Sequence, residues 1–205
     1  MDKEPDADVL IVDGSALVHA LPPKRSKTFE DYAALDFLPV IHMYTSKYTM
    51  THLVFDVYSA SSLKAETRSK RGLGGRCKVT NKNTMPSNWH NFLRHNDNKT
   101  ELYHFLADKV AQMSAPNMVI VTKGPAVLST HETGLDGLDK CSHEEADSRI
   151  FVHAAEHGSI SIMIKANDTD VVILALSVFA ALLVWATADA GCIWARSEPA
   201  LDQYT

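Results

Sequence analysis

Seven carboxylates in four short stretches of the sequence are of a type and spacing that suit metal binding. Asp13 ends the apolar run DVLIVD, and Asp56 ends a second such run, THLVFD. Glu144, Glu145 and Asp147 lie in the segment EEAD. Asp168 and Asp170 follow the run SISIMIKA. Clustered carboxylates repel one another unless cations neutralise them. Oxygen ligands without convergent Cys or His favour Mg²⁺ or Mn²⁺ over Zn²⁺.

The elements that must position these acids follow from the hydrophobic pattern. Four runs rich in β-branched residues predict buried strands: DVLIVDGS, THLVFDVYS, NMVIVTKG and SISIMIKAND. Helical patterns lie at about 29–48, 61–71, 99–113 and 142–157. This alternation predicts an α/β fold, a three-layer α/β/α sandwich with a mainly parallel central sheet. Acids that follow parallel strands are then expected at one edge of the sheet, where such folds bind ligands.

Composition indicates a single globular domain in the cell interior. The chain has 205 residues, of which 45% are hydrophobic and 22% charged, with a net charge of -5. We expect a core at about 8–188 and an irregular tail at 189–205. Cys77, Cys141 and Cys192 share no CxxC spacing, which disfavours a disulfide framework. The polar, acidic start lacks the features of a secretory signal, so we expect a nuclear or cytoplasmic protein.

One apolar segment competes with that interpretation. The run from Val171 to Ala188 has 18 residues without a charge, the length of a membrane-helix candidate. Acids adjoin both ends, and no basic residues flank it as they do in membrane helices. These features favour a buried helix followed by a buried strand, and no membrane association is expected.

A concentrated basic segment lies between positions 64 and 82, where Glu66 is the single acid. A solvated charged helix gives the same pattern, but positive charge beside an acidic pocket suits the phosphate backbone of a nucleic acid. The sequence leaves open whether that partner is DNA or RNA. The residues expected to bind it are Lys64, Arg68, Lys70, Arg71, Arg76 and Lys78.

Four blocks of the sequence resemble a known family of enzymes. In order, VLIVDGSALVH, LVFDVYSASSLKAETRSKR, EEADSRIFVHAA and KANDTDVVILAL are similar to the metal-binding blocks of PIN-like, flap-endonuclease type 5′-nucleases. In overall look the chain also resembles PIN-like domains associated with mobile elements. The resemblance implies hydrolysis of phosphodiester bonds in DNA or RNA with two Mg²⁺ or Mn²⁺ ions. The implied catalytic and metal-binding residues are Asp13, Asp56, Glu145, Asp147, Asp168 and Asp170.

The resemblance does not decide which glutamate of the third block, EEAD, corresponds to the metal ligand. Helical geometry places Glu144 and Asp147 on one face, whereas Glu145 and Asp147 project apart unless the helix start is irregular. The inner ligand is therefore either Glu144 or Glu145. For the family's additional late acid, Asp189 is the remaining candidate.

Two alternative functions fit parts of the sequence. Flap endonucleases carry a long helical arch, whereas the interval between Arg71 and Trp89 is short. A catalytically inactive PIN-like module that binds nucleic acid or protein is therefore the main alternative. The motif HAAEH, His153 to His157, matches the HxxEH pattern of zinc peptidases. Such a short pattern arises readily in a chain with 10 His, so zinc peptidase ranks last.

Overall fold

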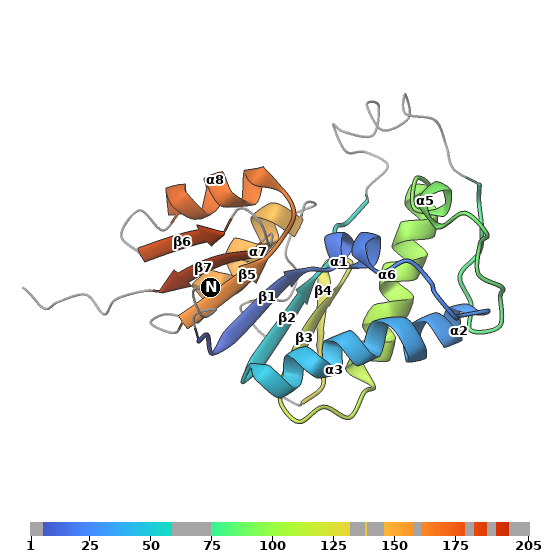
Figure 1. Cartoon of the computed structure of the whole chain (residues 1–205), viewed down its shortest axis with the longest axis horizontal. Helices are drawn as coiled ribbons and strands as arrows, with labels where there is room; N and C mark the ends of the chain where they lie inside the picture. The colour runs from blue at the N-terminus through green and yellow to red at the C-terminus, as the bar shows by residue number, and fades with distance from the viewer. Residues whose placement is uncertain are drawn as a thin grey trace, which may run out of the picture.

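The computed structural model describes residues 6–58, 75–131, 138, 146–157, 161–178, 183–187 and 192–196. Within these residues, the strands form a seven-stranded sheet in the order β4-β3-β2-β1-β5-β7-β6 (Figure 1). Four adjacent strands are parallel, and the sequence predicted all of them from their apolar runs. They are β1 (Val9–Asp13), β2 (Met50–Val54), β3 (Met118–Lys123) and β5 (Ser161–Lys165). A mixed α/β fold with a mostly parallel sheet is thus confirmed.

Antiparallel strands complete both edges of the sheet. β4 (Ala126–Ser129) folds back on β3 through a turn in which Gly124 has a φ of 58°, a left-handed conformation that favours glycine. β7 (Cys192–Arg196) pairs with β5 and with β6 (Leu183–Thr187). The expectation of an irregular tail at 189–205 is therefore wrong for Cys192–Arg196. This short segment satisfies its backbone hydrogen bonds by pairing with β5 and β6, which no local pattern predicts.

Helices lie on both faces of the sheet (Figure 1). The described ones are α1 (Gly14–Ala20), α2 (Phe29–Asp31), the π-helix η1 (Tyr32–Phe37), α3 (Leu38–Lys47), α5 (Trp89–Phe92), α6 (Asn96–Ala111), α7 (Ala146–Ala155) and α8 (Thr169–Val178). Leu10 and Val12 of β1 belong to a core shared with α1, α3 and α6, whereas Val9 and Ile11 belong to one shared with α7 and α8. Burial on both faces explains why the parallel strands are apolar throughout.

The helix predicted at 29–48 forms, but it widens in the middle. α2, η1 and α3 follow one another without a break. Pro39 has no N–H to bond to the fourth residue before it. Next to it, the Leu38 N–H donates to the Ala33 carbonyl, five residues back. The π-helical turn therefore accommodates the proline. The helix predicted at 61–71 lies outside the described residues.

The apolar segment Val171 to Ala188 is divided between α8 and β6. A helix followed by a strand is what its flanking acids predicted. Across the described ranges, no helix has the length and hydrophobicity needed to cross a membrane.

Candidate acidic site at the carboxyl edge of the sheet

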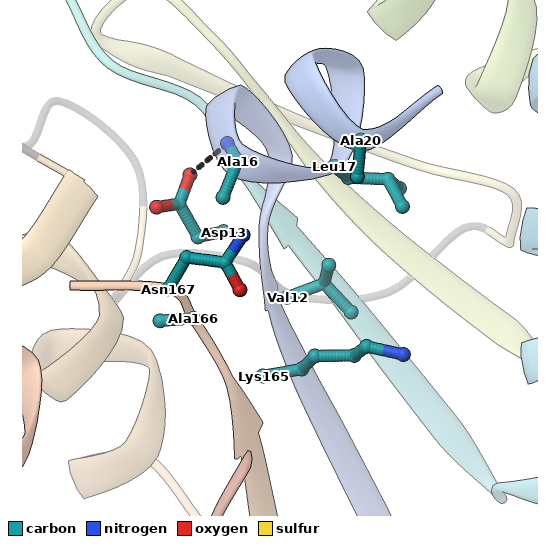
Figure 2. Close-up of a pocket in the computed structure, with 8 residues that line it drawn as sticks. All are labelled: Val12, Asp13, Ala16, Leu17, Ala20, Lys165, Ala166 and Asn167. Carbon is teal, nitrogen blue, oxygen red and sulfur yellow. Dashed lines mark hydrogen bonds between the residues drawn. The ribbon is translucent and has the colours of Figure 1, made fainter. Parts of the chain in front are cut away.

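Asp13 lies where β1 turns into α1. Its Oδ1 accepts a hydrogen bond from the Ala16 N–H at 2.9 Å, so the carboxylate caps the helix (Figure 2). The next residue, Gly14, permits close packing here, because an added Cβ would lie 2.6 Å from the ring of Phe55. Only 8% of the Asp13 surface is exposed. The chain thus places an acid in its interior at the end of its first strand.

Asp56 follows β2 and connects three parts of the fold. Its Oδ1 accepts from the N–H of Ala146, the first residue of α7, at 2.9 Å. Its Oδ2 accepts from the Tyr58 hydroxyl at 2.9 Å, and its own N–H donates to the Ser15 hydroxyl at 3.2 Å. A carboxylate at a helix N-terminus is favourable because it meets unpaired N–H groups and the positive end of the helix dipole. Asp56 therefore fixes α7 against β2.

Asp147, in the first turn of α7, brings a third negative charge to this edge. Burial, with the nearby charges of Asp56 and Asp147, raises the pKa of Asp13 to about 7, although the hydrogen bond from Ala16 acts in the opposite direction. Asp56 and Asp147 are thus near enough to Asp13 for their charges to act on its carboxyl. A buried carboxyl that shares its surroundings with two more carboxylates is a favourable place for a cation.

Asp168 and Asp170 follow β5 and are exposed. The Asp168 Oδ1 accepts from the Asp170 N–H at 2.9 Å, a turn that starts α8. Beside Asp13, the strand instead presents Asn167, and both line a cavity of about 40 Å³ (Figure 2). The carboxylates that raise the pKa of Asp13 come from Asp56 and Asp147. The final acid pair therefore lies at the expected edge, but turned toward solvent.

Lys165 also lines the cavity beside Asp13. Its ammonium group extends toward α3, where it donates to the Tyr44 hydroxyl at 3.2 Å. In Figure 2 its side chain accordingly runs away from Asp13. Lys165, the basic residue nearest in sequence to Asp168 and Asp170, is thus bonded to α3 rather than directed toward the acidic edge.

The donor chemistry of this edge fits Mg²⁺ or Mn²⁺, because its side-chain ligands are carboxylate and amide oxygens. The geometry fits in part. Among the described residues, no group of three or more His, Cys, Asp or Glu side chains is arranged to hold a metal ion. Glu144, Glu145 and the late candidate Asp189 lie outside the described residues. Burial of Asp13 disfavours its charged form, and either a proton or a cation offsets this cost.

Two of the basic residues predicted to bind nucleic acid are described. The Arg76 guanidinium pairs with Glu101 of α6 and donates to the Asn98 Oδ1 at 3.0 Å. Arg76 therefore ties its segment to α6, whereas Lys78 is exposed. The other four, Lys64, Arg68, Lys70 and Arg71, lie outside the described residues.

Ser15, Tyr58 and Asn167 surround the acids, and sequence reasoning did not assign them to the site. The Ser15 hydroxyl accepts a hydrogen bond from the Asp56 N–H and so links α1 to the segment after β2. Tyr58 lies two residues after Asp56 and reaches back to it, a contact that the order of residues in VFDVY permits but does not require. Asn167 directly precedes the DxD pattern, and the end of β5 at Lys165 decides which side chain faces Asp13.

The histidines of the zinc-peptidase motif HAAEH contact a third histidine and lie away from the acidic edge. His153 and His157 lie near the other end of α7, and each contacts His52 of β2. Glu156, which a peptidase would need beside the metal, is exposed.

No family model, no curated protein and no solved structure matches this chain.

Proposed function

We propose that the chain is a PIN-like, metal-dependent nuclease that hydrolyses phosphodiester bonds in DNA or RNA at the acidic edge of a three-layer α/β/α sandwich. The observation that carries this proposal is the acidic group itself. Asp13 ends β1, Asp56 follows the adjacent parallel strand β2, and the charges of Asp56 and Asp147 act on the buried Asp13. Burial of the Asp13 carboxylate is unfavourable, and binding of a functional cation would offset this cost.

Asp13, Asp56 and Asp147 would hold the metal, with Asp168, Asp170 and Glu144 or Glu145 completing the shell. When bound, Mg²⁺ or Mn²⁺ neutralises the acids, polarises the phosphate and lowers the pKa of water. The chain's own contribution is positioning. Tyr58 and Ser15 orient Asp56, and Asp56 fixes the first residue of α7 and hence the place of Asp147. The basic segment would bind the phosphate backbone.

Cleavage assays test this proposal. Purified protein is incubated with labelled single-stranded, flap and duplex substrates in Mg²⁺, Mn²⁺ or EDTA. We expect cutting with metal alone, and its loss in Asp13→Asn and Asp147→Asn. Glu156→Gln is the matched control, because Glu156 is an exposed acid just beyond the far end of α7. Metal-independent cutting, or full activity in Asp13→Asn, would contradict the proposal.

A second candidate is a PIN-like module that binds nucleic acid or protein without catalysis. Its support is the exposed position of Asp168 and Asp170, apart from the buried Asp13. Thermal melting with Mn²⁺ separates the two candidates. A metal that binds only the folded form stabilises it by about 2.7 kcal/mol at a hundredfold excess over its Kd. Absence of both cutting and metal stabilisation, with nucleic-acid binding intact, would favour the binding module.

A further inference from the structure

Three imidazoles meet between β2 and α7, on the face of the sheet that α7 covers. The Nδ1 atoms of His52 and His153 are 2.8 Å apart, and the Nε2 atoms of His52 and His157 are 2.7 Å apart. Both neighbouring rings lie nearly perpendicular to His52, at 90° and 84°. His52 and His153 are fully buried, whereas His157 is partly exposed. His52 thus uses both ring nitrogens, one toward the interior and one toward the surface.

A thioether joins the outer nitrogen of this cluster. The Met50 Sδ lies 3.2 Å from the His52 Nε2, the same atom that faces the His157 Nε2. Met50 begins β2 and is partly exposed, like His157. Met118, its register partner on β3, adds a second thioether residue to the same position of the sheet. Two imidazole nitrogens and a sulfur therefore gather at a point that is open to solvent on one side.

The contacts themselves require lone pairs at this point, because two ring nitrogens 2.7 or 2.8 Å apart form a hydrogen bond only if one donates and the other accepts. Burial lowers the pKa of His52 well below its ordinary value, with further lowering by His153 and His157. Burial also lowers the pKa of His157, although the charge of Glu156 opposes this effect. Neutral imidazoles carry one N–H and one lone pair each. If the His52 Nδ1–H donates to His153, the His52 Nε2 presents its lone pair toward Met50 and His157.

The ligand set indicates the kind of cation. Thioether sulfur is a soft ligand that selects Cu(I), and imidazole suits the same ion. The charged groups that act on these imidazoles are Arg149, beside His153, and Glu156, beside His157. With no carboxylate among the three ligands, a single positive charge is less costly to bury than a double one.

We propose that Met50, His52 and His157 form a binding site for Cu(I), with His153 as a positioning residue behind His52. His153 accepts from the His52 Nδ1–H and thereby fixes which His52 nitrogen meets the metal, as second partners of metal-binding imidazoles do. Binding needs His157 to move its proton from Nε2 to Nδ1, so the neutral cluster takes up the cation without releasing a proton. The site lies beyond Ala155, at the end of α7 away from Asp147, and is independent of the proposed nuclease function.

Anaerobic competition against a chromophoric Cu(I) chelator tests the site in the full chain. We expect one Cu(I) per chain, with affinity at least about tenfold weaker in Met50→Leu and in His157→Gln. Met43→Leu and His42→Gln are matched controls, because these neighbouring residues of α3 are exposed, and they should bind as wild type. Leucine is close to methionine in volume, so Met50→Leu should keep the fold. If His157→Gln is unstable, the Cu(I) affinity of Met50→Leu alone tests the site.

A second readout identifies the atoms. Titration with Ag(I), a redox-inert substitute for Cu(I), should shift the imidazole ¹⁵N resonances of the His52 and His157 Nε2 atoms and leave the His153 Nε2 unshifted. Three results would overturn the proposal: failure of the wild type to compete for Cu(I), wild-type affinity in both ligand variants, or tighter binding of Zn²⁺ than of Cu(I) in the same assay.

Discussion

The two ends of α7 differ in the chemistry that gathers around them. At the N-terminal end, Asp56 accepts from the Ala146 N–H, and Asp147 lies near Asp13. At the C-terminal end, His153 and His157 contact His52. The positive end of the helix dipole favours carboxylates, and the negative end favours a bound cation. The same helix thus separates oxygen ligands for hard cations from nitrogen and sulfur ligands for soft ones.

Burial acts on both groups but drives their protonation in opposite directions. It raises the pKa of Asp13 to about 7 and lowers that of His153 to about 3, because the interior disfavours the charged form of each. The imidazoles bond to one another and stay neutral. The Asp13 and Asp56 carboxylates accept hydrogen bonds from N–H and O–H donors, and the charges of Asp56 and Asp147 act on Asp13. The candidate ligands at the acidic end are therefore anionic oxygens, which suit a hard cation.

The largest expected effect tests the imidazole end. Between pH 6.5 and about 3 the unfolded chain binds a proton at His153 that the folded chain does not, so stability falls as the pH falls. The loss from His153 amounts to about 5 kcal/mol across that range. In His153→Asn, whose amide can replace the Nδ1 contact, this part of the loss should disappear. Urea unfolding in EDTA at a series of pH values measures it. Equal pH slopes in variant and wild type would show that His153 does not stay neutral by burial.

The acidic end should respond with the opposite sign. The Asp13 carboxyl has an ordinary pKa of 3.8 and a folded one of about 7, so the folded chain binds the extra proton in this range. The contribution of Asp13 to stability is then greatest below pH 3.8 and is lost as the pH rises through 7, by up to about 4 kcal/mol. Asp13→Asn, which keeps the bond from Ala16, should be more stable than wild type at pH 8 without metal. The same urea series near pH 4 is the control, where the two proteins should converge. A variant that is less stable at pH 8 would contradict the prediction.

A smaller effect concerns the backbone beside Asp13. In Gly14→Ala the new methyl group meets the Phe55 ring at 2.6 Å, so the ring or β1 must shift. Overpacking of this kind costs about 1–3 kcal/mol. Gly75→Ala is the matched control, because its nearest contact would be an ordinary 3.7 Å from the Asn91 amide nitrogen. Thermal melting of both variants checks the difference. Equal melting temperatures of the two variants would contradict the prediction, because they would show that the junction of β1 and α1 accommodates the added methyl group.

The strands and acids of the acidic end were largely predictable from sequence. β1, β2, β3 and β5 are apolar runs bounded by turn residues, and Asp13 and Asp56 terminate two of them. The bond between Asp56 and Ala146 joins residues 90 apart and depends on how α7 packs. The exposure of Asp168 depends on where β5 ends. These are tertiary properties, which local patterns do not encode.

The imidazole end was less predictable for the same reason. The spacing of His153 and His157 suggested two ligands on one helix face, and the alternation of Met50 and His52 places both on one face of β2. Neither pattern indicates that the two pairs meet. Their meeting requires α7 to lie across β2 at one particular register, which only the folded chain defines.

Calorimetric titration with Mn²⁺ at neutral pH tests most directly whether the N-terminal end of α7 holds a hard cation. The wild type should give a saturable binding heat, and Asp13→Asn should lose it while Met50→Leu retains it. If the wild type shows no saturable heat, or if Asp13→Asn binds Mn²⁺ as the wild type does, the acidic edge is not the metal site of a nuclease.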